Sequence, residues 1–141
     1  MTLHLVPLGT AALGLAAPLM MPGTPNGTRA IVEITSAVYD GDRFRAKLAA
    51  GAAAADWLVV APDGTGLMDV RLAVETHDGA TVYLAYGGRI DLSAGVEGAT
   101  VYSTPRFETG DERYQWLNRI QAVAKGVITG GVLNYEIYEL R

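Results

Sequence analysis

Three Asp-Gly pairs separate stretches rich in valine, isoleucine, tyrosine and threonine, and this pattern constrains the fold more than any other feature. The pairs are Asp40-Gly41, Asp63-Gly64 and Asp78-Gly79. Glycine adopts the positive φ angle that a tight hairpin requires without a Cβ clash, and β-branched and aromatic residues favour strands. The pattern therefore predicts an all-β fold built from sequential antiparallel hairpins.

These turn signals set the boundaries of the predicted strands. The strands are expected at residues 29–39, 43–48, 57–61, 66–76, 81–87, 99–103, 119–128 and 132–140, the last two joined through Thr129-Gly130-Gly131. Sequential hairpins favour an antiparallel meander, and closure removes exposed edges. We therefore expect a single antiparallel β-barrel, calycin-like or a similar small closed barrel.

Helix is scarce in the sequence, with at most one or two short turns. Residues 49–55 have a composition for one turn, although Gly51 and the short length disfavour it. Residues 111–117 favour another, with Asp111 as N-cap and Glu112 in the first turn, where a negative charge suits the helix dipole. Either turn would act as a lid or plug.

Size and composition indicate one globular domain spanning residues 1–141. Half of the residues are apolar, fewer than a fifth are charged, and the net charge is −4. The Lys and Arg residues are scattered, so no nucleic-acid partner is expected. The absence of cysteine removes disulfides and thiolate chemistry, and the cytoplasm is the expected location.

The first 27 residues are predicted to form a first strand and a long crossing loop. The apolar run at residues 3–21 lacks the Lys or Arg that begins a secretory signal, and prolines and glycines interrupt it. It is also too short and too broken for a membrane helix, so no membrane partner is expected. Leu19, Met20 and Met21 should pack on the barrel or on a neighbouring subunit.

Charge, aromatic rings and turn residues are concentrated between residues 104 and 118, without strand or helix periodicity. Apolar walls with a few fixed polar groups are typical of a ligand pocket, and this segment supplies both in Arg106, Glu108, Tyr114, Trp116 and Asn118. Alternatively the segment is a structural latch, in which the charged pair bonds internally and Trp116 plugs the core. The sequence leaves both interpretations open.

The predicted strand at residues 66–76 has one apolar and one polar face. The apolar face carries Met68, Val70, Leu72 and Val74, and the other face carries Asp69 and Arg71. If the apolar face covers the core, Asp69 and Arg71 form a weak surface ion pair. If the barrel interior is polar, they line its lumen.

Asp56-Trp57 and two tyrosines are further candidates. A carboxylate beside an aromatic wall can have a raised pKa and act as an acid or base, whereas Asp also commonly bonds backbone amides before a strand and Trp57 can be ordinary core. Tyr83 and Tyr86 alternate along one strand and cannot both face one cavity. Either could donate a hydrogen bond to a ligand oxygen.

Metal and nucleotide signatures are missing. His4 and His77 are the only histidines, which makes a catalytic triad or multi-histidine metal site improbable. Gly87-Gly88-Arg89 and Gly130-Gly131 lack the strand-to-helix context of a phosphate-binding loop. We expect no cofactor and no metal.

Several motifs carry a resemblance to a known family. They are Ala55-Asp56-Trp57, Pro62-Asp63-Gly64-Thr65, Asp69-Val70-Arg71, Asp78-Gly79, Gly87-Gly88-Arg89, Pro105-Arg106-Phe107-Glu108-Thr109-Gly110 and Trp116-Leu117-Asn118. In order and spacing the chain resembles the family catalogued as domain of unknown function 3237. The resemblance implies a small antiparallel β-barrel without an agreed activity, and it favours the lumen for Asp69 and Arg71.

These observations lead to one functional hypothesis and two alternatives. The barrel interior is expected to bind a small, uncharged or weakly acidic organic molecule and to catalyse a cofactor-independent proton transfer, such as isomerisation, hydration, elimination or cyclisation. The alternatives are a non-catalytic carrier and a homo-oligomeric interaction protein. The expected acid or base is Asp56 or Glu108, Arg71 and Arg106 stabilise negative charge, and the ligand contacts are Trp57, Asp69, Tyr83, Arg89, Tyr114, Trp116 and Asn118.

The apolar run at residues 13–21 exceeds what a small barrel covers, so we expect a homodimer or a larger homo-oligomer. Light scattering on the purified protein should give the mass of two or more chains. A monomeric mass would refute the prediction.

Overall fold

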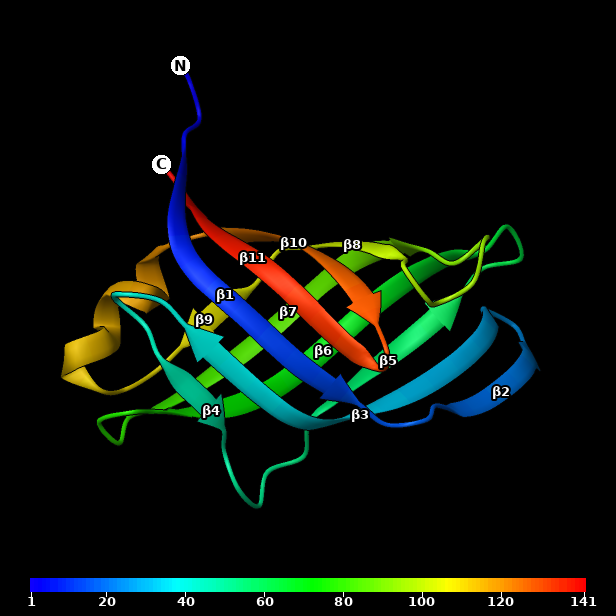
Figure 1. Ribbon diagram of the computed structural model, residues 1–141, viewed down its shortest axis with the longest axis horizontal. Helices are drawn as coiled ribbons and strands as arrows, with labels where there is room; N and C mark the ends of the chain where they lie inside the picture. The colour runs from blue at the N-terminus through cyan, green and yellow to red at the C-terminus, as the bar shows by residue number, and fades with distance from the viewer.

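A closed antiparallel barrel of eight strands forms the body of the protein (Figure 1). The computed structural model describes residues 1–141. Its elements are β1 (Leu5–Leu15), β2 (Leu19–Thr24), β3 (Gly27–Asp40), β4 (Ala46–Leu48), β5 (Ala55–Val60), β6 (Thr65–Thr76), β7 (Thr81–Asp91), β8 (Thr100–Ser103), β9 (Arg106–Glu108), the 3₁₀ helix η1 (Glu112–Arg119), β10 (Ala122–Thr129) and β11 (Val132–Leu140). The predicted all-β antiparallel barrel is confirmed.

The barrel closes through strands that are distant in sequence. Around the wall the order is β3, β1, β11, β10, β8, β7, β6 and β5, which pairs again with β3. Three short strands lie outside this order: β2 pairs with β3, β4 pairs with both β3 and β6, and β9 pairs with β7. Closure leaves the eight wall strands without a free edge along most of their length.

Strict alternation of side chains fills the interior from every strand. On β6, Val70, Leu72 and Val74 are almost fully buried, and the side chains between them face outward. Met68 lies in the same inward row and packs against the core. The predicted apolar face of this strand is therefore the barrel interior.

Aromatic rings fill one end of the barrel, beneath η1. Phe44 lies 5.8 Å from Tyr39, 5.7 Å from Phe107 and 6.4 Å from Tyr114 between ring centroids, in tilted or edge-to-face contacts. Leu117 of η1 is fully buried among core residues. Asp111 caps η1 as predicted, since its side chain accepts from the Arg113 amide. In Figure 1, η1, β4 and β9 lie at this end and β2 lies at the other.

The β6–β7 connection sets which tyrosine enters the barrel. Gly79 has a φ of +92°, its amide donates to the Thr76 carbonyl, and Thr76 in turn donates to the carbonyl of Ala80. This register opposes Val70 to Tyr86 and Ala73 to Tyr83. Tyr86 is therefore buried inside, and Tyr83 faces outward.

The Asp40-Gly41 pair does not form the tight turn that its sequence predicts. Strands β3 and β4 do pair, but through a wider loop, and Gly41 has no positive φ. A Cβ at Gly41 would overlap the Leu8 carbonyl oxygen, so this glycine is required by close approach to β1.

Two further expectations need correction. Residues 19–24 form strand β2 along β3, where a crossing loop was predicted, and Leu19, Met20 and Met21 are 62%, 53% and 40% exposed. Residues 49–54 form an irregular loop with a turn and no helix. No helix of the structure has the length and apolar character needed to cross a membrane.

Candidate functional site

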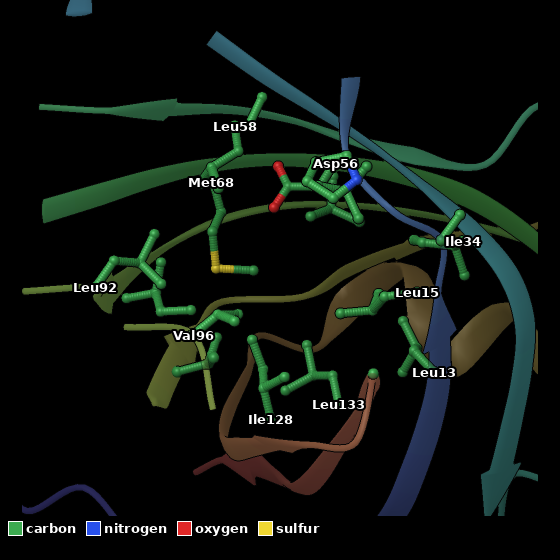
Figure 2. A pocket seen from close by; sticks show the side chains of 18 of the residues that line it. Leu13, Leu15, Ile34, Asp56, Leu58, Met68, Leu92, Val96, Ile128 and Leu133 are labelled. Carbon is green, nitrogen blue, oxygen red and sulfur yellow. The ribbon is translucent and has the colours of Figure 1, made fainter. Parts of the chain in front are cut away.

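A cavity of about 460 Å³ occupies the barrel at the end away from η1 (Figure 2). Nineteen of its 23 lining residues are hydrophobic. They come from the inner faces of most wall strands, with β2 and connecting loops forming the rim. The lining includes Leu15, Met20, Val32, Asp56, Leu58, Met68, Val70, Tyr86, Glu97, Ile128 and Leu133. The volume is in the range of pockets that bind small organic molecules.

The rim of the cavity is held together by a carboxylate. The Glu97 side chain, from the loop after β7, accepts from the Gly130 amide at 3.1 and 3.3 Å, and Gly130 lies in the β10–β11 turn. Residues 15–18 and Met20 form the facing part of the rim. The rim is therefore formed by the β1–β2, β7–β8 and β10–β11 connections and by β2.

Asp56 is the carboxylate within the wall of this apolar cavity. It lies on β5 in an inward row that runs across three strands, where Asp56 pairs with Val70 and Val70 pairs with Tyr86. Figure 2 shows its carboxylate on the same wall as Leu58 and Met68. Asp56 and Glu97 are the only charged side chains that line the cavity, and no Lys or Arg does.

The backbone ladder is interrupted beside Asp56. Pairing between β5 and β6 is absent between the 56–70 and 59–67 positions. The Asp69 amide donates to Asp56 Oδ1 at 2.9 Å, and the Trp57 carbonyl accepts from Arg29 Nη1 at 2.8 Å. In a regular ladder the Asp69 amide would bond the Trp57 carbonyl. The carboxylate thus replaces a backbone acceptor and is held in a fixed orientation.

Burial raises the pKa of the Asp56 carboxyl from 3.8 to about 6. The hydrogen bond from the Asp69 amide opposes this rise in pKa, and the nearby Asp69 charge adds to it. A carboxyl with a pKa near 6 exchanges a proton readily close to neutral pH, which suits a general acid or base.

Tyr86 places a hydroxyl near the same cavity. The residue is buried, and this burial raises the pKa of its hydroxyl well above the ordinary value. The Tyr135 ring on β11 lies 6.3 Å from the Tyr86 ring at an angle of 83°. Both hydroxyls therefore stay protonated at neutral pH and are available as hydrogen-bond donors.

Several predicted site residues lie on the outer face of the barrel. The expectation that Asp69 and Arg71 line the lumen is wrong: they form an exposed pair at 3.8 Å, because they alternate with inward Met68 and Val70. Exposed Arg89 donates to the Gly88 carbonyl, and Tyr83 is also exposed. None of these four residues lines the cavity, and neither does Trp57.

The remaining predicted residues belong to the plugged end. Arg106 and Glu108 are exposed on β9. The Tyr114 hydroxyl donates to Asp78 Oδ1 at 2.8 Å, and Trp116 packs under the Arg43 guanidinium at 4.9 Å.

The polar residues of this segment fix η1 in place. Asn118 Oδ1 accepts from the Thr109 amide, and Asn118 Nδ2 donates to the Thr109 carbonyl. Of the two interpretations of residues 104–118, the contacts of Tyr114, Trp116 and Asn118 agree with the latch, although Arg106 and Glu108 are exposed and do not form the expected internal pair. Of the predicted site residues, Asp56 alone lines the cavity.

The sequence offered Tyr86 as an alternative to Tyr83, but the predicted site included Tyr83, and the aliphatic lining was missed. The alternation of Tyr83 and Tyr86 showed that the two could not both face one cavity, and choosing between them required the register of the β6–β7 turn. The aliphatic residues carry no distinguishing signal, because a cavity wall and a filled core have the same composition.

Comparison with known proteins identifies the family. The model for the family described as protein of unknown function (DUF3237) matches residues 3–140. The chain belongs to this family. A UPF0311 protein from Rhodopseudomonas palustris is 29% identical over 103 residues, and the match covers 64% of this chain and 66% of that relative, so the chain spans slightly less than two thirds of its length.

Solved structures share the fold over the whole chain. A β-barrel-like protein from Acinetobacter baumannii is 27% identical with a TM-score of 0.88, and the match covers 100% of this chain and 98% of that one. An enzyme from Penicillium herquei is 19% identical with a TM-score of 0.70, covering 99% and 94%. At this identity the second likeness shows the fold alone.

The raised pKa of Asp56 predicts a pH-dependent cost to stability. Ionisation of Asp56 is easier in the unfolded chain than in the fold, so the contribution of this group to stability is fully present below pH 3.8 and is lost as pH rises through about 6. Asp56→Asn keeps an acceptor for the Asp69 amide and removes the charge. Between pH 4 and pH 7 its stability relative to wild type should rise by about 1–3 kcal/mol in urea unfolding, allowing for partial solvation. A pH-independent difference would contradict the assignment.

Proposed function

We propose that the barrel binds a small, largely apolar organic molecule in the cavity and that Asp56 transfers a proton to or from it without a cofactor. The observation that carries this proposal is a carboxylate with a pKa near 6 in an otherwise apolar wall. The aliphatic lining supplies affinity through burial of apolar surface, and the carboxylate supplies the chemistry.

The geometry assigns roles to Asp56 and to the Asp69 amide. As a carboxylate, Asp56 takes a proton from a C–H or O–H group of the bound molecule, and as a carboxylic acid it returns the proton to another atom. The Asp69 amide fixes the orientation of the carboxyl through Oδ1. Such a two-way transfer serves isomerisation, hydration, elimination or cyclisation alike.

The comparisons support this proposal only at the level of the fold. The enzyme from Penicillium herquei has a similar barrel, which is consistent with catalysis in such a scaffold. Glu108, Arg71 and Arg106 have no part in the proposed mechanism because they are exposed on the outer face. The carrier alternative shares the ligand site and differs only in the absence of turnover.

Filling the cavity should abolish ligand binding. Val32 points into the cavity from β3, whereas its neighbour Ile31 does not line it. We expect Val32→Trp to weaken binding of the neutral fluorescent probe N-phenyl-1-naphthylamine at least tenfold, because the indole occupies the site. Ile31→Trp is the matched control and should bind the probe as the wild type does. Equal binding by both variants would place the probe elsewhere and count against the proposal.

Proton transfer can be tested without the natural substrate. In deuterium oxide the protein should accelerate exchange of the α-protons of 2-tetralone, followed by NMR, because Asp56 removes a proton and returns deuterium. Asp56→Asn should lower the catalysed rate roughly 100-fold, the scale of general-base catalysis.

Two results would decide between the alternatives in this experiment. Glu108→Gln tests the competing sequence-based assignment, and we expect it to exchange at the wild-type rate. Binding of 2-tetralone without accelerated exchange would favour the carrier over the enzyme.

A further inference from the structure

Three hydroxyl groups lie together where the cavity meets the barrel core. Tyr86 on β7 and Tyr135 on β11 are each 4% exposed, and Ser103 on β8 is 3% exposed. The Tyr86 and Tyr135 rings meet edge to face, and the Tyr86 and Ser103 hydroxyls both influence the pKa of Tyr135. Tyr86 lines the cavity, whereas Tyr135 and Ser103 do not and lie behind it, so the cluster reaches the ligand space through Tyr86.

Two of these hydroxyls have only other members of the cluster within reach, and at poor hydrogen-bond geometry. Ser103 Oγ and Tyr135 Oη are buried, and neither makes a hydrogen bond of acceptable geometry. Buried polar groups in native proteins are nearly always paired, because an unpaired group loses its hydration without compensation. Apolar residues of similar size would avoid this loss, so the cluster calls for an explanation beyond packing.

The sequence makes room for this cluster at a neighbouring position. Gly126 on β10 pairs with Tyr135 on β11 and faces the interior. A Cβ at Gly126 would lie 2.7 Å from Tyr135 Cδ1 and 2.9 Å from Leu133 Cδ1. The glycine therefore leaves the space that the tyrosine ring occupies, and the ring carries its hydroxyl into the cluster.

The charges around the cluster restrict what it can hold. No Lys or Arg lines the cavity, and the nearest charged side chain in the same row is Asp56. An anionic ligand would face an uncompensated carboxylate in an apolar site, which is unfavourable. Neutral hydroxyl donors are suited to a neutral acceptor oxygen.

We infer that the Tyr86 hydroxyl, backed by the hydroxyls of Tyr135 and Ser103, forms a subsite for one neutral oxygen of the ligand, a ketone carbonyl or a phenol hydroxyl, with the apolar body of the ligand toward the rim. The inference rests on the proposed function and specifies its substrate class. For a ketone, the α C–H bond breaks toward Asp56, the electron pair forms the enolate C=C bond, and the carbonyl oxygen gains charge. Hydrogen bonds from the cluster stabilise that charge, and return of the proton from Asp56 restores a neutral molecule.

The test compares two ligands of the same shape that differ by one oxygen. Displacement of N-phenyl-1-naphthylamine is measured with 2-tetralone and with tetralin, its hydrocarbon counterpart. The wild type should bind 2-tetralone about tenfold more tightly, since the ketone oxygen pairs with the cluster. Tyr86→Phe combined with Tyr135→Phe should remove this preference while the affinity for tetralin stays within about twofold, because phenylalanine keeps the ring contacts.

Controls separate failure of the subsite from failure of the cavity. Tyr102→Phe, on the exposed face of β8 beside Ser103, should keep the preference. If the double variant does not fold, as judged by circular dichroism, Ser103→Ala should reduce the preference. Equal affinity of the wild type for both ligands, or a preference that survives the substitutions, would overturn the inference and leave ligand binding intact. Failure of both ligands to displace the probe would instead contradict the proposed function.

Discussion

Every inward side chain of a closed barrel shares one enclosed volume, and the rest of this structure depends on how that volume is divided. At one end, rings from Tyr39, Phe44, Phe107 and Tyr114 occupy the interior in tilted or edge-to-face contacts. At the other end the inward residues are mainly aliphatic, and about 460 Å³ stays open. The filled end stabilises the barrel, so the open end can remain hollow.

The fold was largely predictable because the turn chemistry and the strand alternation are local signals. Asp63-Gly64 and Asp78-Gly79 mark real turns with positive φ at the glycine, and the apolar row on β6 is the interior. Strand β2 escaped prediction because its pairing with β3 is set by tertiary structure, and prolines flank and interrupt its apolar run. The sequence predicted that Gly41 forms a tight turn, whereas the glycine is required by its close approach to β1, a contact between residues far apart in the sequence.

The site was less predictable than the fold, for two physical reasons. A one-residue change in register reverses every side chain of a strand, and a two-residue turn at Asp78-Gly79 would have opposed Tyr83 to Val74 and placed it inside. The observed three-residue connection selects Tyr86. Arg106 and Glu108 were conspicuous in sequence but lie exposed on β9, and the neutral side chains of Asn118 and Tyr114 fix η1. Asp56 could be identified from the sequence, but its partner, the Asp69 amide, could not, because a sequence does not reveal where the β5–β6 pairing is interrupted.

The interruption of the β5–β6 ladder makes the contact between these strands depend on the Asp56 side chain. The Asp56 carboxylate accepts a hydrogen bond from the Asp69 amide and so helps to join β5 to β6. Protonation of Asp56 weakens this interstrand hydrogen bond. A proton transfer at Asp56 therefore also changes the strength of a hydrogen bond that joins β5 to β6. The ionised carboxylate makes the stronger hydrogen bond to the Asp69 amide, although burial makes the ionised form the less stable one overall.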